Sequence, residues 1–114
     1  MAINNLDITN TAQTIITVPV DKSYVVTTIM IVNTAAPDPT NDLAGLTKLT
    51  MHIVNNGGTG SIGNANMVIK ELPLSAGETF VMDTEKIVLE AGDSIVVFST
   101  TPNNLSGTLS YVEI

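Results

Sequence analysis

The chain has 114 residues, with 11 acidic side chains against four basic ones and a formal net charge of −7. This length is typical of one domain, and the absence of cysteine excludes thiolate catalysis, cysteine-bound zinc and iron–sulfur centres. The four cations are all lysines, so we expect no nucleic-acid partner, because an acidic chain without arginine repels phosphates.

The composition favours β-structure and excludes a membrane span. Valine, isoleucine and threonine contribute 12, 12 and 16 residues, and all three are β-branched. The longest apolar run, residues 29–32, is far shorter than the roughly 18 residues that a spanning helix needs. The N-terminus lacks the cationic and apolar regions of a secretory signal, so we expect the protein to mature where it is made.

Residues 1–12 are polar and show no clear strand pattern, which predicts an extended N-terminal arm before a single domain at 13–114. An arm of this kind is a candidate for contact with a neighbouring subunit. The candidate interaction residues are Ile3, Asn4, Asn5, Leu6, Asp7 and Ile8.

The rest of the chain alternates short apolar stretches with turn-like clusters of proline, glycine and asparagine. We expect eight short strands, near residues 13–18, 24–33, 46–55, 65–71, 78–83, 86–89, 94–100 and 107–114. This spacing, without intervening helical patterns, predicts an all-β fold, an antiparallel and jelly-roll-like β-sandwich.

Alternation assigns faces to three of these strands. In residues 48–53, Leu49, Met51 and Ile53 share one face, which we expect in the core, while the other face meets solvent. Residues 29–32 and 95–98 are apolar on both faces, as in central strands whose second face is also covered. A loop, the N-terminal segment or a neighbouring subunit could supply that cover, and we favour the subunit.

A sequence echo links two turns. Residues 74–79 (LSAGET) recur as residues 89–94 (LEAGDS), fifteen positions on. The glycine in each predicts a tight turn with positive φ, and the acid after it predicts a hydrogen bond to a nearby backbone N–H.

Candidate chemical motifs are weak. Residues 58–63 match G-x-G-x-x-G, but a strand-like stretch follows rather than a helix, which favours a hairpin loop. His52 is the only histidine, which excludes a triad with a second histidine and a two-histidine metal site. It shares the polar face of its strand with Lys48 and Thr50, so it is interpreted as a surface residue. Two carboxylate pairs (Asp83 with Glu85, Glu90 with Asp93) and a possible calcium loop (Asp38, Asn41, Asp42) all lie at turns, so we expect no enzyme activity, cofactor or metal.

A sugar-binding module is a second option for a sandwich, and its aromatic platform would have to be Tyr24 or Tyr111. Phe80 and Phe98 lie within apolar strands and are expected in the core.

One family resemblance adds to this picture. The chain over residues 13–114 resembles small virion proteins of tailed bacteriophages, those of marine and cyanobacterial phages in particular. The similarity is carried by residues 17–19, 24–33, 49–54, 70–79, 83–95 and 109–114.

The resemblance implies a β-sandwich subunit of the virion, assembled in the host cytoplasm and without catalytic residues. We expect a capsid decoration protein that binds the major capsid protein or another virion protein, as a homo-oligomer with a trimer favoured. Tail, collar or fibre subunits are the alternative within this class.

Overall fold

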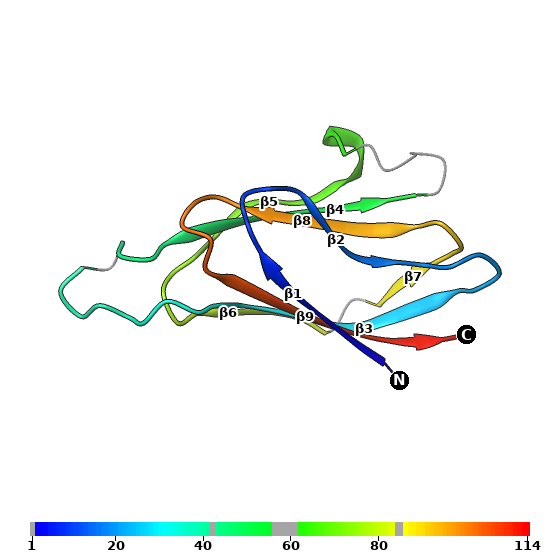
Figure 1. Ribbon diagram of the computed structural model, residues 1–114, viewed down its shortest axis with the longest axis horizontal. Coiled ribbons are helices and arrows are strands. Elements are labelled where there is room, and N and C mark those ends of the chain that lie inside the picture. The colour runs from blue at the N-terminus through cyan, green and yellow to red at the C-terminus, as the bar shows by residue number, and fades with distance from the viewer. Residues whose placement is uncertain (1, 42, 56–61, 84–85) are drawn as a thin grey trace.

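The computed structural model describes residues 2–41, 43–55, 62–83 and 86–114 (Figure 1). Nine strands and one short 3-10 turn make up its regular elements. They are β1 (Ala2–Ile8), β2 (Gln13–Thr17), β3 (Tyr24–Asn33), β4 (Thr47–Val54), η2 (Asn64–Asn66), β5 (Met67–Leu74), β6 (Thr79–Met82), β7 (Ile87–Leu89), β8 (Ser94–Ser99) and β9 (Leu105–Glu113).

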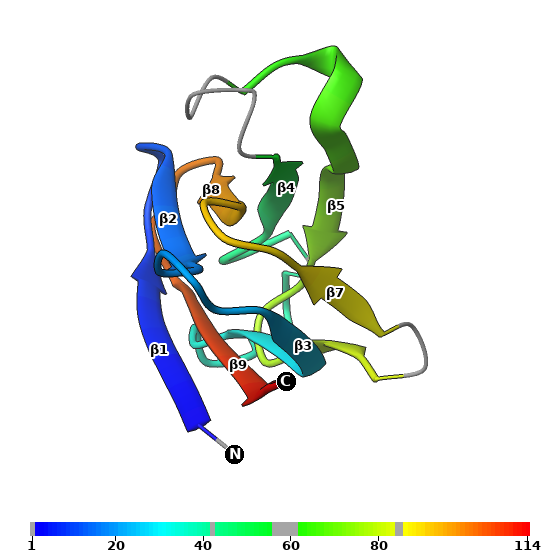
Figure 2. The same cartoon turned by 90° about the vertical axis from the view of Figure 1, so that its right-hand side faces the viewer.

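The strands form two antiparallel sheets packed face to face. Sheet A has the order β1-β9-β3-β6, with β7 also paired to β3, and sheet B has the order β2-β8-β4-β5. Figure 2 shows the two layers end-on, with β1, β9 and β3 below β8, β4 and β5. The expected β-sandwich is therefore confirmed, and the eight expected strands match β2 to β9 to within three residues at each end.

The pairings are nested. β4 pairs with β5, β3 with both β6 and β7, β2 with β8, and β1 with β9, so successive pairs alternate between sheets B and A. A long hairpin rolled up in this way is a jelly roll, in which β6 and β7 together occupy one strand position.

The core fills the space between the sheets. Its largest fully buried side chains come from both sheets and are Ile8, Ile29, Ile31, Leu49, Met51, Leu89, Ile95, Leu105, Leu109, Val18, Val26 and Val54. Burial of this much branched aliphatic surface is the main stabilising contribution to a domain without disulfides.

The N-terminal residues differ from the expected arm. Residues 2–8 form β1, which pairs with β9 in unbroken register from Ala2 opposite Tyr111 to Ile8 opposite Leu105. Ile8 is fully buried, and its Cδ1 would lie 3.1 Å from a Cβ built on Gly107. This segment therefore completes sheet A and the core, and the arm prediction is wrong for residues 2–8.

The two echoed turns have the geometry that the sequence predicts. Gly77 and Gly92 have φ of 81° and 87°. Glu78 Oε1 and Asp93 Oδ2 each accept a hydrogen bond from the backbone N–H three residues earlier, at 2.6 and 2.9 Å. The acids therefore close their own turns.

The same two turns also dock alike on the end of another strand. The N–H of Gly77 donates to the carbonyl of Asn33, and the N–H of Gly92 donates to the carbonyl of Val18. In return, Asn33 and Val18 donate their own N–H groups to the carbonyl of the acid that follows the glycine. The two echoed segments thus form the same turn, and each is held to a strand end by the same pair of backbone hydrogen bonds.

A buried amide holds the long β3–β4 connection in place. Asn33 is 1% exposed, and its Nδ2 donates to the carbonyls of Gly45 at 2.7 Å and Leu74 at 2.9 Å. Its Oδ1 accepts from the N–H of Ala35, and Asn104 Nδ2 donates to the same Gly45 carbonyl. These hydrogen bonds join the end of β3 to the β3–β4 connection and to the end of β5, and they join the β8–β9 connection to the β3–β4 connection.

The second faces of β3 and β8 differ. On β8, Val96 is buried and Phe98 half-buried within the single chain, whereas on β3 Met30 remains 43% exposed. The expectation that both strands have a covered second face is confirmed for β8, where the chain itself provides the cover. β3 keeps an open face.

Candidate interaction face

The open side of sheet A is the candidate site. Side chains alternate across a strand, and the inward set is identified by the core, so the registers assign the remaining side chains to the outside. The outer face of sheet A consists of Ile3, Asn5, Asp7, Val25, Thr28, Met30, Val32, Thr79, Val81, Val88, Ser106, Thr108, Ser110 and Val112.

Asp7 is the one ionisable side chain among the strand residues named above, and Lys86 borders the face, with its Nζ donating to the carbonyl of Thr27 on β3. Four apolar side chains stand out from it: Ile3, Met30, Val81 and Val88 are 61, 43, 48 and 58% exposed. On a chain of net charge −7, such a surface is suited to contact with another neutral surface.

Hydroxyl and amide groups run between the apolar side chains and hold one another in place. Thr108 Oγ1 donates to Asn5 Oδ1 at 3.0 Å, which links β9 to β1. Thr27, at a bulge in β3, places its Oγ1 2.7 Å from Ser110 Oγ. These groups can both donate and accept, so the face offers no fixed polarity to a partner.

The predicted interaction residues divide between the two sides of β1. Ile3, Asn5 and Asp7 lie on the outer face of sheet A, whereas Asn4, Leu6 and Ile8 point inward. Asn4 Nδ2 donates to the carbonyl of Ile15 at 3.0 Å, and Leu6 packs against the core. Of the six predicted residues, only Ile3, Asn5 and Asp7 are therefore placed for contact with a neighbour.

Sequence reasoning did not identify the larger part of this face, which belongs to β3, β6, β7 and β9. The signal was present as alternation: Thr28, Met30 and Val32 on β3 face outward opposite Ser110, Thr108 and Ser106 on β9. It was not used, because the central run 29–32 was interpreted as covered on both sides.

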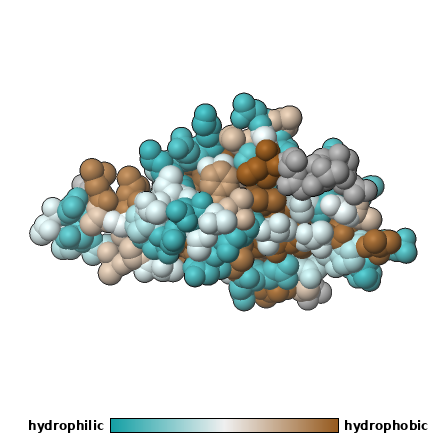
Figure 3. Space-filling model, turned by 45° about the horizontal axis from the view of Figure 1, so that its top comes forward, coloured by the Kyte–Doolittle hydropathy of each residue, from teal (hydrophilic) through white to brown (hydrophobic). Residues whose placement is uncertain are grey.

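The outer face of sheet B is different. Figure 3, in which the upper side of Figure 1 is turned toward the viewer, shows hydrophobic residues in separate spots among hydrophilic ones. Lys48 and Lys70 are exposed on β4 and β5, and Glu71 follows with a positive φ of 48°. The charges and the irregular strand make this side a poorer flat contact surface.

His52 is buried, at 2% exposure, so its assignment as a surface residue is wrong. Its Nδ1 lies 2.8 Å from Asn66 Oδ1, and its ring stacks on Phe98 with 6.0 Å between centroids. Thr50 on the same strand is also buried, with Oγ1 accepting from the N–H of Glu71. The polar face of β4 is covered because residues around η2 and β5 fold over it.

The two tyrosines do not form an exposed platform together. Tyr24 is 9% exposed and its ring lies against that of Tyr111, with centroids 4.5 Å apart and planes tilted by 34°. Tyr111 is half-buried and packs against the core. Phe80 packs against the core, as predicted, whereas Phe98 is half-buried on the outer side of β8 beside His52, so the prediction that it lies in the core is wrong.

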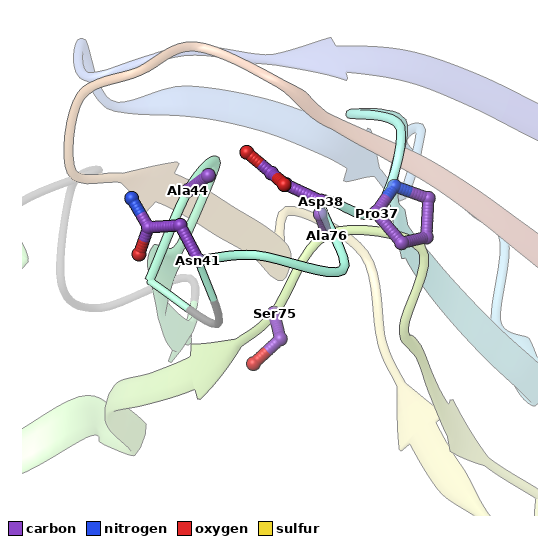
Figure 4. A pocket seen from close by; sticks show the side chains of 6 residues that line it. All are labelled: Pro37, Asp38, Asn41, Ala44, Ser75 and Ala76. Carbon is purple, nitrogen blue, oxygen red and sulfur yellow. The ribbon is translucent and has the colours of Figure 1, made fainter.

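A small recess lies at the far end of the sandwich, between the β3–β4 connection and the β5–β6 turn (Figure 4). It has a volume of about 220 Å³ and is lined by Pro37, Asp38, Asn41, Ala44, Ser75 and Ala76. Asp38 Oδ1 accepts from the N–H and Oγ1 of Thr40, and these hydrogen bonds hold the pKa of the Asp38 carboxyl below its ordinary value. The carboxylate is thus engaged in its own turn.

The other chemical candidates fare similarly. Asn41 Oδ1 accepts from the N–H of Leu43. Asp42 and Glu85 lie outside the described residues, as do residues 58–61 of the glycine-rich stretch 58–63. Within the described ranges, no three histidine or acidic side chains gather in a way that could hold a metal ion. Among the same residues, no helix is long and apolar enough to cross a membrane.

Comparisons with protein-family models, with curated proteins and with solved structures found no match to this chain.

Proposed function

We propose that this chain is a non-enzymatic structural protein of a bacteriophage virion, a capsid decoration protein that binds the outside of the assembled shell. Copies would bridge adjacent subunits of the major capsid protein and stabilise the shell against the pressure of packaged DNA. The work of such a protein is adhesion, and the outer face of sheet A is the observation that carries the proposal.

Three features support an adhesive role. The outer face of sheet A is broad, open and nearly uncharged, and three of the residues proposed for contact from sequence lie on it. Backbone hydrogen bonds of the two glycine turns and the Asn33 amide join the connecting segments at the ends of the sandwich to the strands. Jelly rolls occur in viral capsid domains, which is a fold-level analogy only.

Many copies on one lattice add up to strong binding even where each contact is small. A copy that touches two sites gains from effective concentration, so modest interfaces give high occupancy. This mechanism needs neither a cofactor nor a catalytic group.

Cryo-electron microscopy of intact particles tests the proposal. Density for this sandwich on the capsid lattice is the expected result. Density confined to the tail, collar or fibres would transfer the chain to that alternative, and absence from the particle would overturn a virion role altogether.

A further inference from the structure

β1 lies at the edge of sheet A, where β9 is the one strand paired to it in the described part of the chain (Figure 2). We propose that an extended segment of a partner protein, carrying a lysine or arginine, adds to this edge as a further strand antiparallel to β1. The proposal rests on the proposed function in treating the chain as adhesive, and it concerns the backbone edge of β1 rather than the outer face of sheet A.

Two hydrogen bonds show how the backbone of β9 is oriented between its neighbours. Successive residues of a strand direct their N–H and C=O groups to opposite sides. Just beyond one end of β9, the N–H of Ile114 donates to the carbonyl of Ser23. Just before the other end, the carbonyl of Asn104 accepts from the N–H of Thr34. Both bonds continue the register of β3 with β9, so the even-numbered residues of β9 bond to β3 and the odd-numbered ones to β1.

This orientation decides which residues of β1 face the free edge. Every second residue of β1 lies opposite an odd-numbered residue of β9 and is bonded to it, namely Ala2, Asn4, Leu6 and Ile8. The residues between them, Ile3, Asn5 and Asp7, direct their N–H and C=O groups away from β9. Among the described residues, no hydrogen bond reaches the backbone of these three. An antiparallel strand on this side would form three bonded residue pairs, with two hydrogen bonds in each.

The two edges of sheet B carry features that hinder strand addition. On β5, Pro73 has no N–H to offer, and Glu71 has a left-handed φ of 48°. β2 is interrupted by a register shift at Ile15, whose carbonyl accepts from Asn4 Nδ2. Proline and irregular register are common means by which β-proteins protect an edge.

The two edges of sheet A differ from each other. The edge opposite β1 is divided into two short strands, β6 and β7, and Lys86 between them donates its Nζ to the carbonyl of Thr27. β1 has no such protection, because its seven residues keep an unbroken register and include neither proline nor lysine. A regular edge left open where the other three are protected indicates a strand partner.

Charge selects the kind of segment. Within the described residues the one ion pair joins Lys22 to Glu113, so Asp7 has no cationic partner there. A lysine or arginine opposite Asp7 on the added strand would supply one, and an apolar residue would cover Ile3, which is 61% exposed. β1 of a second copy offers no cation and brings seven further negative charges, so it fits this edge less well.

Amide hydrogen exchange measured by NMR on the full chain tests the edge itself. In dilute solution we expect the N–H groups of Ile3, Asn5 and Asp7 to exchange at least about tenfold faster than those of Asn4 and Leu6, which are bonded to β9. Equal protection of the two sets would show that the edge is already covered and would overturn the proposal. Protection of the first set that appears only when the chain alone is concentrated would assign the edge to a second copy and overturn the basic partner.

A synthetic threonine-rich peptide then serves as the added strand, with a valine placed opposite Ile3 and a lysine opposite Asp7. The matched control peptide has glutamate in place of the lysine. At millimolar concentration we expect the lysine peptide to slow exchange of the three outward N–H groups at least about fivefold, and the glutamate peptide to bind at least about threefold more weakly. Asp7→Lys should reverse the preference. Absence of protection by the lysine peptide, or an unchanged preference in Asp7→Lys, would refute the proposal.

Two adjacent asparagines provide a matched pair of substitutions. Asn5→Pro removes an outward N–H, so we expect circular dichroism to show an intact fold and binding of the lysine peptide to weaken at least about fivefold. Asn4→Pro removes an N–H that is bonded to β9, and we expect it to lower the melting temperature. Undiminished peptide binding by Asn5→Pro would contradict the assignment of the edge.

The same variants separate this proposal from the virion role. If the wild-type chain binds the lysine peptide through β1 but is absent from particles, the virion role is wrong and the strand-addition site remains. If Asn5→Pro decorates particles at normal occupancy, and no added strand lies beside β1 in the wild-type particle, strand addition to the shell is wrong and the virion role remains.

Discussion

Whether residues 2–8 act as a strand or as a free arm is decided by one substitution in the core. Ile8→Ala removes three carbon groups from a side chain that is fully buried against Gly107. At about 0.8 kcal/mol for each group, the transfer contribution is about 2.4 kcal/mol. The cavity left behind adds to this, so we expect the free energy of unfolding to fall by about 3–4 kcal/mol.

The matched control lies on the same strand. Ile3 is 61% exposed, so Ile3→Ala is expected to lower the free energy of unfolding by less than about 1 kcal/mol. Urea unfolding followed by far-UV circular dichroism measures both changes. For a domain of this size the difference corresponds to roughly 10 °C in melting temperature. Equal and small effects of the two substitutions would refute the placement of β1 in the core.

Three further measurements address the ends of the sandwich. Gly77→Ala forces an L-residue to φ of 81° with its Cβ 3.0 Å from a proline side chain, so we expect a loss of about 1–3 kcal/mol in unfolding free energy, whereas Gly63→Ala, in open space and extended, should be near neutral. Asn33→Ala removes the side-chain donor to the buried Leu74 carbonyl and one of the donors to the Gly45 carbonyl, and should lower the melting temperature by at least 8 °C, from about 2–3 kcal/mol lost; an unchanged value would mean that the amide is not what joins these segments. The side-chain carboxyl of Asp38 should titrate by NMR below the ordinary value of 3.8, and because its folded pKa is lowered, the stability it contributes is present above that value and lost as the pH falls through the folded pKa; a midpoint at or above 3.8 would contradict the hydrogen bonds from Thr40.

Local patterns predicted the greater part of this fold from the sequence. Alternating apolar residues bounded by turns identified eight strands, and the repeated glycine–acid pairs identified two turns, each closed by a hydrogen bond between residues three apart. β1 was missed because Asn4 occupies an inward position, which breaks the apolar alternation. Its amide is satisfied by the carbonyl of Ile15, and alternation within one segment contains no sign of such a partner.

The candidate site was predicted only in part, for a related reason. His52 and Met30 both lie on the side of their strand that faces away from the core, yet one is buried and the other exposed. What decides this is whether a distant segment folds over the strand, as Asn66 does over His52. Cover of this kind depends on tertiary structure, so the sequence predicted two-sided strands without distinguishing which one would stay open.

The pairing of β1 with β9 also determines the order in which the protein can assemble. The inner strands β4 and β5 are separated by only twelve residues, 55–66, whereas Ala2 pairs with Tyr111, more than a hundred residues later. β1 is therefore made well before its partner and can take its place in sheet A only after β9 has been synthesised. Until β1 pairs with it, β9 has an unpaired edge at which a partly folded chain can form wrong strand pairs.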